Sequence, residues 1–439
     1  MRHVLVMTAT GAIGLMAIFV VDFLSLFYVS LLKDDRLTAG VGFATTVMFL
    51  AISANIGSMI AGAAMVARRI GARDEDGARR IASTSLVLSA VIGLVVSIAL
   101  LAAMPWLLPK LGATGLPLEV ATRFLWITLP ANALMALGMS LSGFLRAVGD
   151  PRRAMNVTLF GGLVTAFADP LLIFGLKLGT DGAAWATVIS RLVFMGVGFY
   201  GVSKVHDLVR MPRLREVIAD AKAFMDIAGP AILTNIATPF AALLLYRVLA
   251  PYGEAAIAAN TIIDRLVPVA YGVLFALSGA VGPILAQNLG ARQFDRLRRA
   301  MFDALKFAVI YCLFAWIILF LARHQIAGLF GVSGQTAAYV AFFCVISGAA
   351  WLFNGFLFVA NAAFNNLGFP LYSTAFNWGR ATFGTLPPAM LGSMVAGVEG
   401  ALVGVTIGSI VFGIASAWTA FRAIRKLELR APIGSSEIA

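Results

Sequence analysis

Charged residues are scarce in this chain of 439 residues: they make up 12% of the sequence, against 60% hydrophobic residues. A soluble domain has about 25% charged and roughly 45–50% apolar residues. This shortage of charge excludes an ordinary soluble protein, because an aqueous fold cannot bury so much apolar surface. Uncharged stretches such as 86–108 and 401–421 reach the length of about 20 residues that crosses a membrane.

Cysteine and histidine are also rare. The two cysteines, Cys312 and Cys344, lie inside apolar stretches, so the sequence indicates neither a disulfide framework nor a metal cluster. The three histidines are near the N-terminus or in predicted loops, and no H-E-x-x-H, nucleophile elbow or phosphate-binding loop is present. These absences argue against an enzyme and against ATP-driven transport, and we expect neither a metal nor an organic cofactor.

The apolar stretches lack the alternation of polar and apolar residues that an outer-membrane barrel requires. Backbone groups in lipid must then be satisfied within helices, so the predicted fold class is an all-α membrane protein. No cleavage site of a signal peptide follows the first apolar stretch, which we assign as a helix. Breaks rich in charge, glycine or proline divide the chain into twelve predicted spans: 8–33, 39–69, 81–108, 118–147, 152–177, 182–204, 222–250, 254–288, 300–323, 335–366, 370–394 and 400–425.

The net charge of +12 follows the pattern of membrane topology rather than that of nucleic-acid binding. Arginines cluster after the second, fourth, sixth, eighth and twelfth spans, and the loops on the alternate side carry few basic residues. The positive-inside rule places both termini in the cytoplasm, in a multi-pass protein of the bacterial inner membrane. We expect the lipid bilayer and small organic molecules as its partners, no nucleic acid, and a monomer.

An internal repeat relates the two halves of the chain. Residues 67–80 (A-R-R-I-G-A-R-D-E-D-G-A-R-R) match residues 286–299 (A-Q-N-L-G-A-R-Q-F-D-R-L-R-R), with a displacement of 219. The same displacement relates 149–151 to 368–370. Because each half has six spans, the repeat is parallel, and we predict two six-helix lobes related by a pseudo-twofold axis around a central cavity. The predicted lobes are residues 1–204 and 222–439, the latter with a cytoplasmic tail, joined by a cytoplasmic linker at 205–221.

Two aspartates lie deep inside predicted spans of the first lobe. An aspartate at the centre of a membrane helix costs roughly 2.5–3.5 kcal/mol on insertion scales, so each needs a reason to be there. Asp22 and Asp169 are predicted at similar depths in the first and fifth spans. Thr165 precedes Asp169 by one helical turn, and Thr187 of the sixth span lies at a comparable depth. We predict that these four residues form a cation-coupling site.

The coupling ion is expected to be a proton. Two carboxylates that share a medium of low dielectric constant cannot both ionise at low cost, so the pair should be able to take up a proton. Sodium at Asp22 and Asp169 is the alternative, although it would require about five or six oxygen ligands. Pro170 removes a backbone hydrogen bond and lets its helix bend. In the other interpretation, each aspartate pairs with a lysine or arginine or caps a kinked helix.

Further polar side chains lie within other predicted spans. Asp264, Arg265, Arg191 and Arg380 are interpreted first as internal ion pairs and second as contacts to substrate. Asparagines of the second lobe could line a substrate cavity, although hydrogen bonds between helices explain them equally well. These asparagines are Asn235, Asn260, Asn354, Asn361, Asn365 and Asn377.

The segment 145–190 carries R-A-x-G-D-P-R-R, then D-P-L-L-I-F-G and G-A-A-x-A-T-V-I-S. Together with the loops after the second and eighth spans, these motifs resemble the multidrug and toxic compound extrusion (MATE) family over essentially the whole chain. The resemblance implies antiport of organic, often cationic, compounds by alternating access. It also implies that Asp22 and Asp169 match the coupling acids and that Thr187 matches the hydroxyl of the sixth helix.

The sequence departs from the family pattern at several places, among them the proline of the first helix and the acid of the seventh helix that parts of the family have and this chain lacks. Thr165 stands where asparagine is common, and the usual V-D-x-x-F-x-G of the first span is V-D-F-L-S-L-F here. The alternative function within the same superfamily is a flippase for lipid-linked oligosaccharides. Its large anionic substrate would need a basic cavity, which Arg191, Arg265 and Arg380 could form.

Overall fold

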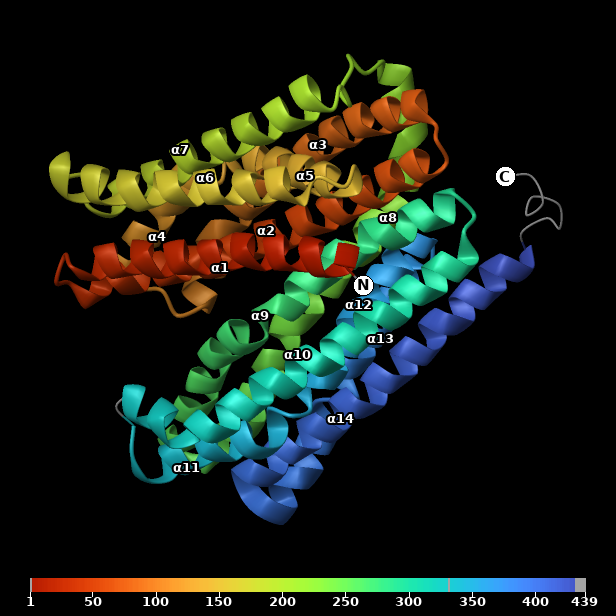
Figure 1. The fold of residues 1–439 in the computed structure, drawn as a ribbon. Coiled ribbons are helices and arrows are strands. Elements are labelled where there is room, and N and C mark those ends of the chain that lie inside the picture. Colours follow the sequence, from red (N-terminus) through yellow and green to blue (C-terminus); the bar gives the residue numbers. More distant parts are fainter. Residues whose placement is uncertain (1, 331, 431–439) are drawn as a thin grey trace. The chain divides into compact units, whose positions relative to one another are not determined.

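The computed structural model describes residues 2–330 and 332–430, and the helices of the first half can be followed in Figure 1. These helices are α1 (Arg2–Ser30), α2 (Asp35–Gly71), α3 (Glu75–Lys110), α4 (Gly115–Thr128), α5 (Asn132–Ala147), α6 (Pro151–Pro170), the π-helix η1 (Leu171–Gly175), α7 (Thr180–Phe199) and the π-helix η2 (Tyr200–Val205).

The second half begins after a short connection at residues 206–213. Its elements are α8 (Leu214–Leu249), the 3-10 turn η3 (Ala250–Tyr252), α9 (Glu254–Gly290), α10 (Phe294–Leu329), α11 (Gly334–Phe342), the π-helix η4 (Phe343–Ser347), α12 (Trp351–Leu367), α13 (Pro370–Thr382) and α14 (Leu386–Arg430). The predicted tail beyond residue 430 lies outside the described residues.

The helices have the lengths and compositions of membrane spans. Eight runs of helix can cross a membrane, or ten when α4 with α5 and α11/η4 with α12, which bend by 57° and 58°, are each counted as one span. The run Pro370–Leu429 contains two crossings, because α14 is broken at Ala396–Gly397. With α1, the described residues account for the twelve predicted spans and confirm the all-α fold class.

Several helices begin earlier than hydropathy predicts, and three of them start in charged segments. α3 begins at Glu75 rather than 81, α8 at Leu214 rather than 222, and α10 at Phe294 rather than 300. Their first turns are rich in charged residues, which a hydropathy pattern assigns to loops. In α3 the carboxylate of Asp74 caps the helix by accepting a hydrogen bond of 2.9 Å from the backbone N–H of Gly77. The early start of α8 at Leu214 shortens the linker predicted at 205–221.

The backbone repeats the predicted internal symmetry. Arg73 and Arg292, which are 219 residues apart, both adopt positive φ angles of 58° and 55°. In each turn the following residue donates its backbone N–H to the carbonyl five residues earlier, at 3.0 and 2.9 Å. Gly149 and Gly368, again 219 apart, have φ angles of 86° and 93°. The two halves thus share their turn geometry as well as sequence motifs.

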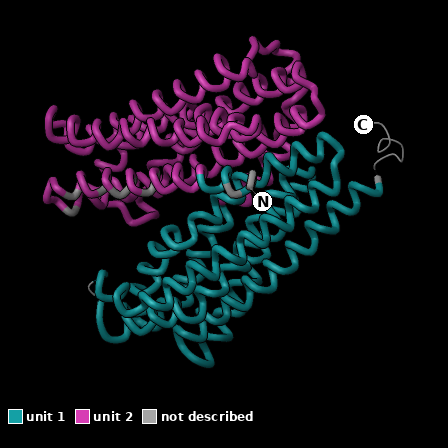
Figure 2. Tube along the Cα trace, viewed as in Figure 1, with its two compact units in different colours: residues 1–9, 236–439 teal, residues 10–235 magenta. Residues whose placement is uncertain are grey.

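The chain forms two compact units (Figure 2). In chain order, residues 10–235, drawn in magenta, are called the first unit here, and residues 1–9 with 236–439, drawn in teal, are called the second unit. Their boundary falls within α8 rather than in the predicted linker at 205–221. The first turns of α8 belong to the first unit because Asp220 accepts hydrogen bonds from Arg80 (3.2 Å) and Thr84 (3.0 Å) of α3. Phe224 of α8 is fully buried in a cluster with Ala61 of α2.

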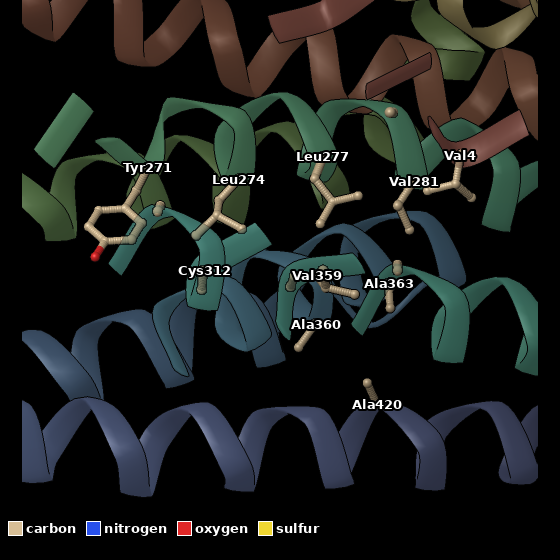
Figure 3. Close-up of a cluster of buried hydrophobic side chains, with 14 of the residues drawn as sticks. Val4, Tyr271, Leu274, Leu277, Val281, Cys312, Val359, Ala360, Ala363 and Ala420 are labelled. Atoms are coloured by element: carbon tan, nitrogen blue, oxygen red, sulfur yellow. The ribbon is translucent and has the colours of Figure 1, made fainter. Parts of the chain in front are cut away.

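The core of the second unit is built around one face of α9. Residues at helical spacing on this face, including Tyr271, Leu274 and Leu277, are buried against α10 and α12 (Figure 3). The Tyr271 hydroxyl donates a hydrogen bond of 2.7 Å to the carbonyl oxygen of Gly348, in the break between η4 and α12. The core therefore also satisfies a backbone group that the bend in this span sets free.

The two arms of α14 pack backbone to backbone through a row of glycines. Gly400, Gly404 and Gly408 recur every four residues, as in the G-x-x-x-G motif of tightly packed membrane helices. A β-carbon added at these three positions would lie 1.9, 2.0 and 1.7 Å from backbone oxygens. These oxygens belong to Gly392 and Pro388 of the other arm and to Gly384, two residues before α14 begins. Only glycine permits this approach.

Candidate functional site

The carboxylate of Asp169 is fully buried in the first unit, near the end of α6. Neither of its oxygens makes a hydrogen bond of ordinary geometry with the described residues, and no lysine or arginine among them lies within 4.0 Å. The Ser25 hydroxyl of α1 interacts with the carboxylate more weakly. An ion pair of Asp169, which was one interpretation of the sequence, is therefore not formed in this part of the chain.

The helix changes its hydrogen-bonding pattern directly after Asp169. Pro170 is the last residue of α6, and the chain continues as the π-helix η1. Proline has no N–H to donate to the preceding turn, which favours such a local widening of the helix. The predicted disturbance at Pro170 is thus seen as a change from α to π geometry beside the buried acid.

Thr165 and Thr187 are positioned by the packing of α6 against α7. Ser190 of α7 donates a hydrogen bond of 2.8 Å to the carbonyl of Gly161 in α6. The two helices are antiparallel, so Thr165 and Thr187, each about one turn further on, lie at a similar level. Their hydroxyls donate to carbonyls of their own helices, at 3.2 and 3.0 Å. The oxygens of both hydroxyls can still accept or ligate.

The side chain of Asp22 lies outside the part of the chain whose side chains the structure describes. The backbone of α1 is described, and it passes close to α6. A β-carbon on Gly162 of α6 would lie 3.0 Å from Val21 of α1, and one on Gly14 of α1 would lie 2.5 Å from the Thr158 hydroxyl of α6. Asp22 precedes Ser25, the neighbour of Asp169, by three residues in the same helix.

A second polar site is a cavity of ≈ 340 Å³ inside the second unit. It lies between α8, α9, η4, α12, α13 and α14, and most of its lining is apolar or aromatic. Of the side chains predicted for a substrate cavity, Asp264, Asn260, Asn354 and Arg380 line it. Such a combination of an apolar wall with a few charged and amide groups is typical of ligand sites.

Asp264 is held by neutral partners. Its Oδ2 accepts a hydrogen bond of 3.0 Å from the Tyr246 hydroxyl and one of 3.3 Å from the Asn260 amide. The Tyr246 hydroxyl also lies 3.2 Å from the Thr261 hydroxyl. Among the described residues no arginine or lysine pairs with Asp264, so the internal ion pair expected for this residue is absent there.

Arg380 also lacks an ion pair among the described residues, although it lines the same cavity. Its Nε is buried and has no hydrogen-bond partner there. The cavity therefore contains a carboxylate and a guanidinium that do not neutralise each other. The ion-pair interpretation fails because α9 and α13 hold the two groups more than 4.0 Å apart.

Arg191 and four of the asparagines predicted for the substrate cavity, Asn235, Asn361, Asn365 and Asn377, do not line it. Arg191 is buried in the first unit, where its Nη1 donates a hydrogen bond of 2.5 Å to the carbonyl oxygen of Thr128. The Asn235 amide donates to its own helix, at Ala231 (2.8 Å). Asn361 accepts hydrogen bonds that hold α12 against α13, one of them from the Asn377 amide at 2.8 Å. The side-chain amides of Asn235 and Asn361 therefore form hydrogen bonds with the backbone and with neighbouring polar side chains, and not with a ligand.

Sequence reasoning missed Tyr246 and Trp351. Tyr246 holds Asp264 from eighteen residues away, and Trp351 lines the cavity and stacks on Tyr271, with ring centroids 5.2 Å apart. A tyrosine directly after the apolar run 240–245 was a usable signal, because a tyrosine hydroxyl away from water needs a partner. The position of Trp351 carries no comparable signal.

Comparisons with known proteins agree in one family. The family model MatE matches residues 12–171 and 230–390. A protein of Shewanella oneidensis named FAD transporter is 29% identical over 436 residues, covering 96% of this chain and 94% of its own. The multidrug export protein MepA of Staphylococcus aureus is 26% identical over 358 residues, covering 79% and 77%.

Solved structures show the same fold. The Vibrio cholerae MATE transporter VcmN in its bent form superposes with a TM-score of 0.92, at 22% identity, covering 98% of each chain.

Proposed function

The chain belongs to the MATE family and is a membrane transporter rather than an enzyme, and from that premise we propose that it exports organic compounds in exchange for protons. The substrates are organic molecules, many of them cationic. The protein works as a monomer in the bacterial inner membrane, with both termini in the cytoplasm. The names of the two relatives, FAD transporter and multidrug export protein, support organic substrates of substantial size.

The observation that carries the proposal is the isolated carboxylate of Asp169. A buried carboxylate without a counter-charge costs several kcal/mol unless a cation or a proton accompanies it. In the described part of the first unit no basic side chain supplies that charge, and the hydroxyls of Ser25, Thr165 and Thr187 are neutral. The coupling ion fills this role.

The site favours a proton over sodium. Sodium would require about five or six oxygen ligands. A proton needs only one carboxylate oxygen of Asp169, whereas sodium would have to gather the hydroxyl oxygens of Thr165 and Thr187, which donate to their own helices, together with further oxygens. Uptake of a proton removes the charge of Asp169 directly beside the π-helix η1. The preferred packing of α1, α6 and α7 then differs between the charged and neutral states, and this difference drives alternating access.

The flippase alternative loses two of its three basic residues. Arg191 is engaged by the carbonyl of Thr128, and Arg265 does not line the cavity of the second unit. Arg380 remains, in the same cavity as the acid Asp264. A cavity with one charge of each sign does not suit a polyanionic substrate, so the structure supports the exporter better.

Transport into inverted membrane vesicles tests the proposal with a fluorescent organic cation such as ethidium. Uptake should stop when the pH gradient is dissipated at constant sodium concentration. Asp169→Asn and Asp22→Asn should each reduce coupled uptake by at least tenfold, because asparagine has the shape of a protonated aspartate but cannot release a proton. Thr187→Val should lower uptake about fivefold through the loss of one hydroxyl hydrogen bond.

Asp181→Asn is the matched control, since it removes an acid of the same lobe that is ion-paired with Arg123. It should transport like the wild type. Uptake that persists without a pH gradient but stops without a sodium gradient would replace the proton by sodium. Full activity of Asp169→Asn at normal expression would remove this residue from the mechanism.

A further inference from the structure

The cavity of the second unit contains two opposite charges without a direct contact between them. Arg380 of α13 and Asp264 of α9 both line a space of ≈ 340 Å³. A buried guanidinium nitrogen without a hydrogen-bond partner is costly, because its lost hydration is not replaced. The Nε of Arg380 is such a nitrogen within the described residues. An anionic group of a ligand in this cavity would supply the counter-charge that Arg380 lacks among the described residues.

The carboxylate of Asp264 has one oxygen available for a ligand. Both hydrogen bonds that it accepts, from Tyr246 and Asn260, go to Oδ2. They hold the carboxylate in place without neutralising its charge. Oδ1 accepts no hydrogen bond from the residues that the structure describes, and it can bind a cationic or hydrogen-bond-donating group of the same ligand.

Aromatic side chains line the same cavity as these two charged groups. Phe275, Trp351 and Phe358 line the cavity, and Phe275 packs on Phe358 with ring centroids 4.8 Å apart. Such faces suit a flat apolar body. The volume lies in the range of pockets that hold drug-sized molecules, about 300–1,000 Å³.

The internal repeat gives this cavity its place in the fold. Adding 219 to Asp22 and Thr187 leads to Ala241 and Thr406, and both of these residues line the cavity. The second unit thus has a cavity at the equivalent of the region predicted for cation coupling in the first. Its acid comes from another helix, however, and an arginine has been added.

We propose that this cavity is a binding site for zwitterionic, ring-containing compounds. Arg380 binds the carboxylate of the compound, Asp264 binds its cationic group, and the aromatic wall binds the ring. The inference rests on the proposed export of organic compounds and narrows their class, since a purely cationic compound leaves Arg380 without a partner.

Rhodamine 110 and its methyl ester provide a matched pair of probes. They share one cationic ring system, and only rhodamine 110 has a free carboxylate. Binding to the purified full-length protein in detergent is measured by fluorescence anisotropy, with no ion gradient. Wild-type protein should bind rhodamine 110 about tenfold more tightly than the ester, as expected for one added hydrogen bond between charged groups.

Substitutions assign the two ends of the ligand. Arg380→Gln should abolish the preference for rhodamine 110 over its ester, because it weakens the binding of rhodamine 110 alone. Arg380→Lys should restore part of this preference. Asp264→Asn should weaken the binding of both dyes about tenfold, because both dyes keep the cationic ring system. Arg323→Gln is the control, since Arg323 donates to the carbonyl of its own helix at Phe320 and does not line the cavity.

Equal binding of the two dyes by wild-type protein would overturn the inference, and so would binding of neither. This comparison needs no variant and stands even if Arg380→Gln fails to fold. A preference that survives in folded Arg380→Gln would also overturn it. A failure of proton coupling in vesicles would leave the binding result intact, so the two proposals fail separately.

Discussion

The guanidinium of Arg191 donates a hydrogen bond of 2.5 Å to the carbonyl oxygen of Thr128, the last residue of α4. The last carbonyls of a helix have no partner within it, and a cation is favourable at this end. The break between α4 and α5 creates such an end inside the membrane-spanning part of the chain. Arg191 of α7 therefore stabilises the 57° bend of this span.

Replacement of Arg191 should cost stability rather than substrate recognition. Arg191→Gln should lower the free energy of unfolding by about 1.5–3 kcal/mol, the usual contribution of a hydrogen bond to a charged group. The measurement is thermal unfolding of the purified protein in detergent. Arg123→Gln removes an arginine from an exposed ion pair with Asp181 and should change stability by less than about 1 kcal/mol. An equal loss in both variants would contradict this role of Arg191.

Asp150 lies at the start of α6, outside the membrane-spanning segments. It accepts hydrogen bonds from the backbone N–H and the side chain of Arg153 (3.1 and 2.5 Å), and the His206 Nε2 lies 3.0 Å from its carboxylate. Burial raises the pKa of Asp150, but the hydrogen bonds from Arg153 and His206 outweigh it and hold the pKa below its ordinary value of 3.8. The ionised carboxylate therefore stabilises the native state above pH 3.8, and this contribution disappears as the pH falls below it.

Two substitutions separate the capping role of Asp150 from its charge. Asp150→Ala should cost about 1 kcal/mol at neutral pH, because the helix loses its cap. Asp150→Asn keeps a capping oxygen and should cost less. Unfolding midpoints recorded from pH 7 down to pH 3 should converge for wild type and Asp150→Asn at the acid end. A constant difference across this range would show that the charge is irrelevant.

The glycine row of α14 should tolerate no β-carbon. Gly404→Ala should destabilise the protein by about 1–3 kcal/mol, the usual cost of overpacking, because the new methyl group would lie 2.0 Å from the Pro388 carbonyl. Gly279→Ala in α9 is the matched control, since no atom lies within 4 Å of its added β-carbon. Unfolding measured in detergent should show that the stability of this control equals or slightly exceeds that of the wild type. Equal stability of the two variants would contradict the packing described for α14.

The twelve spans were predictable because hydrocarbon imposes one length and one kind of secondary structure on each. The bends were not. Pro130, between α4 and α5, is a local signal for a break, yet a window of apolar residues reads across it. The other bend, at residues 348–350, has no proline and depends on Tyr271 of α9 to satisfy a freed carbonyl. Contacts between distant segments decide such positions.

The candidate sites were predictable to different degrees. The cost of an acid in lipid singles out Asp169 and Asp264, and helical periodicity connects Asp169 with Thr165. Periodicity cannot show which polar group faces a given arginine. Arg191 and Arg380 have similar sequence contexts, in apolar runs after a serine or glycine, but one binds a backbone carbonyl and the other lines a cavity. Only the packing of the helices separates them.

The paired turns at Arg73 and Arg292 record how this chain arose. Both keep an arginine in a backbone conformation that glycine adopts at the lowest cost, as expected of copies of one ancestral six-helix segment joined by gene duplication. The acids have not been inherited in the same way, since Ala241 stands at the counterpart of Asp22. Duplicated halves that preserve their turns can diverge in charge without losing their fold, so natural selection can change the ligand of one half while the other retains its own.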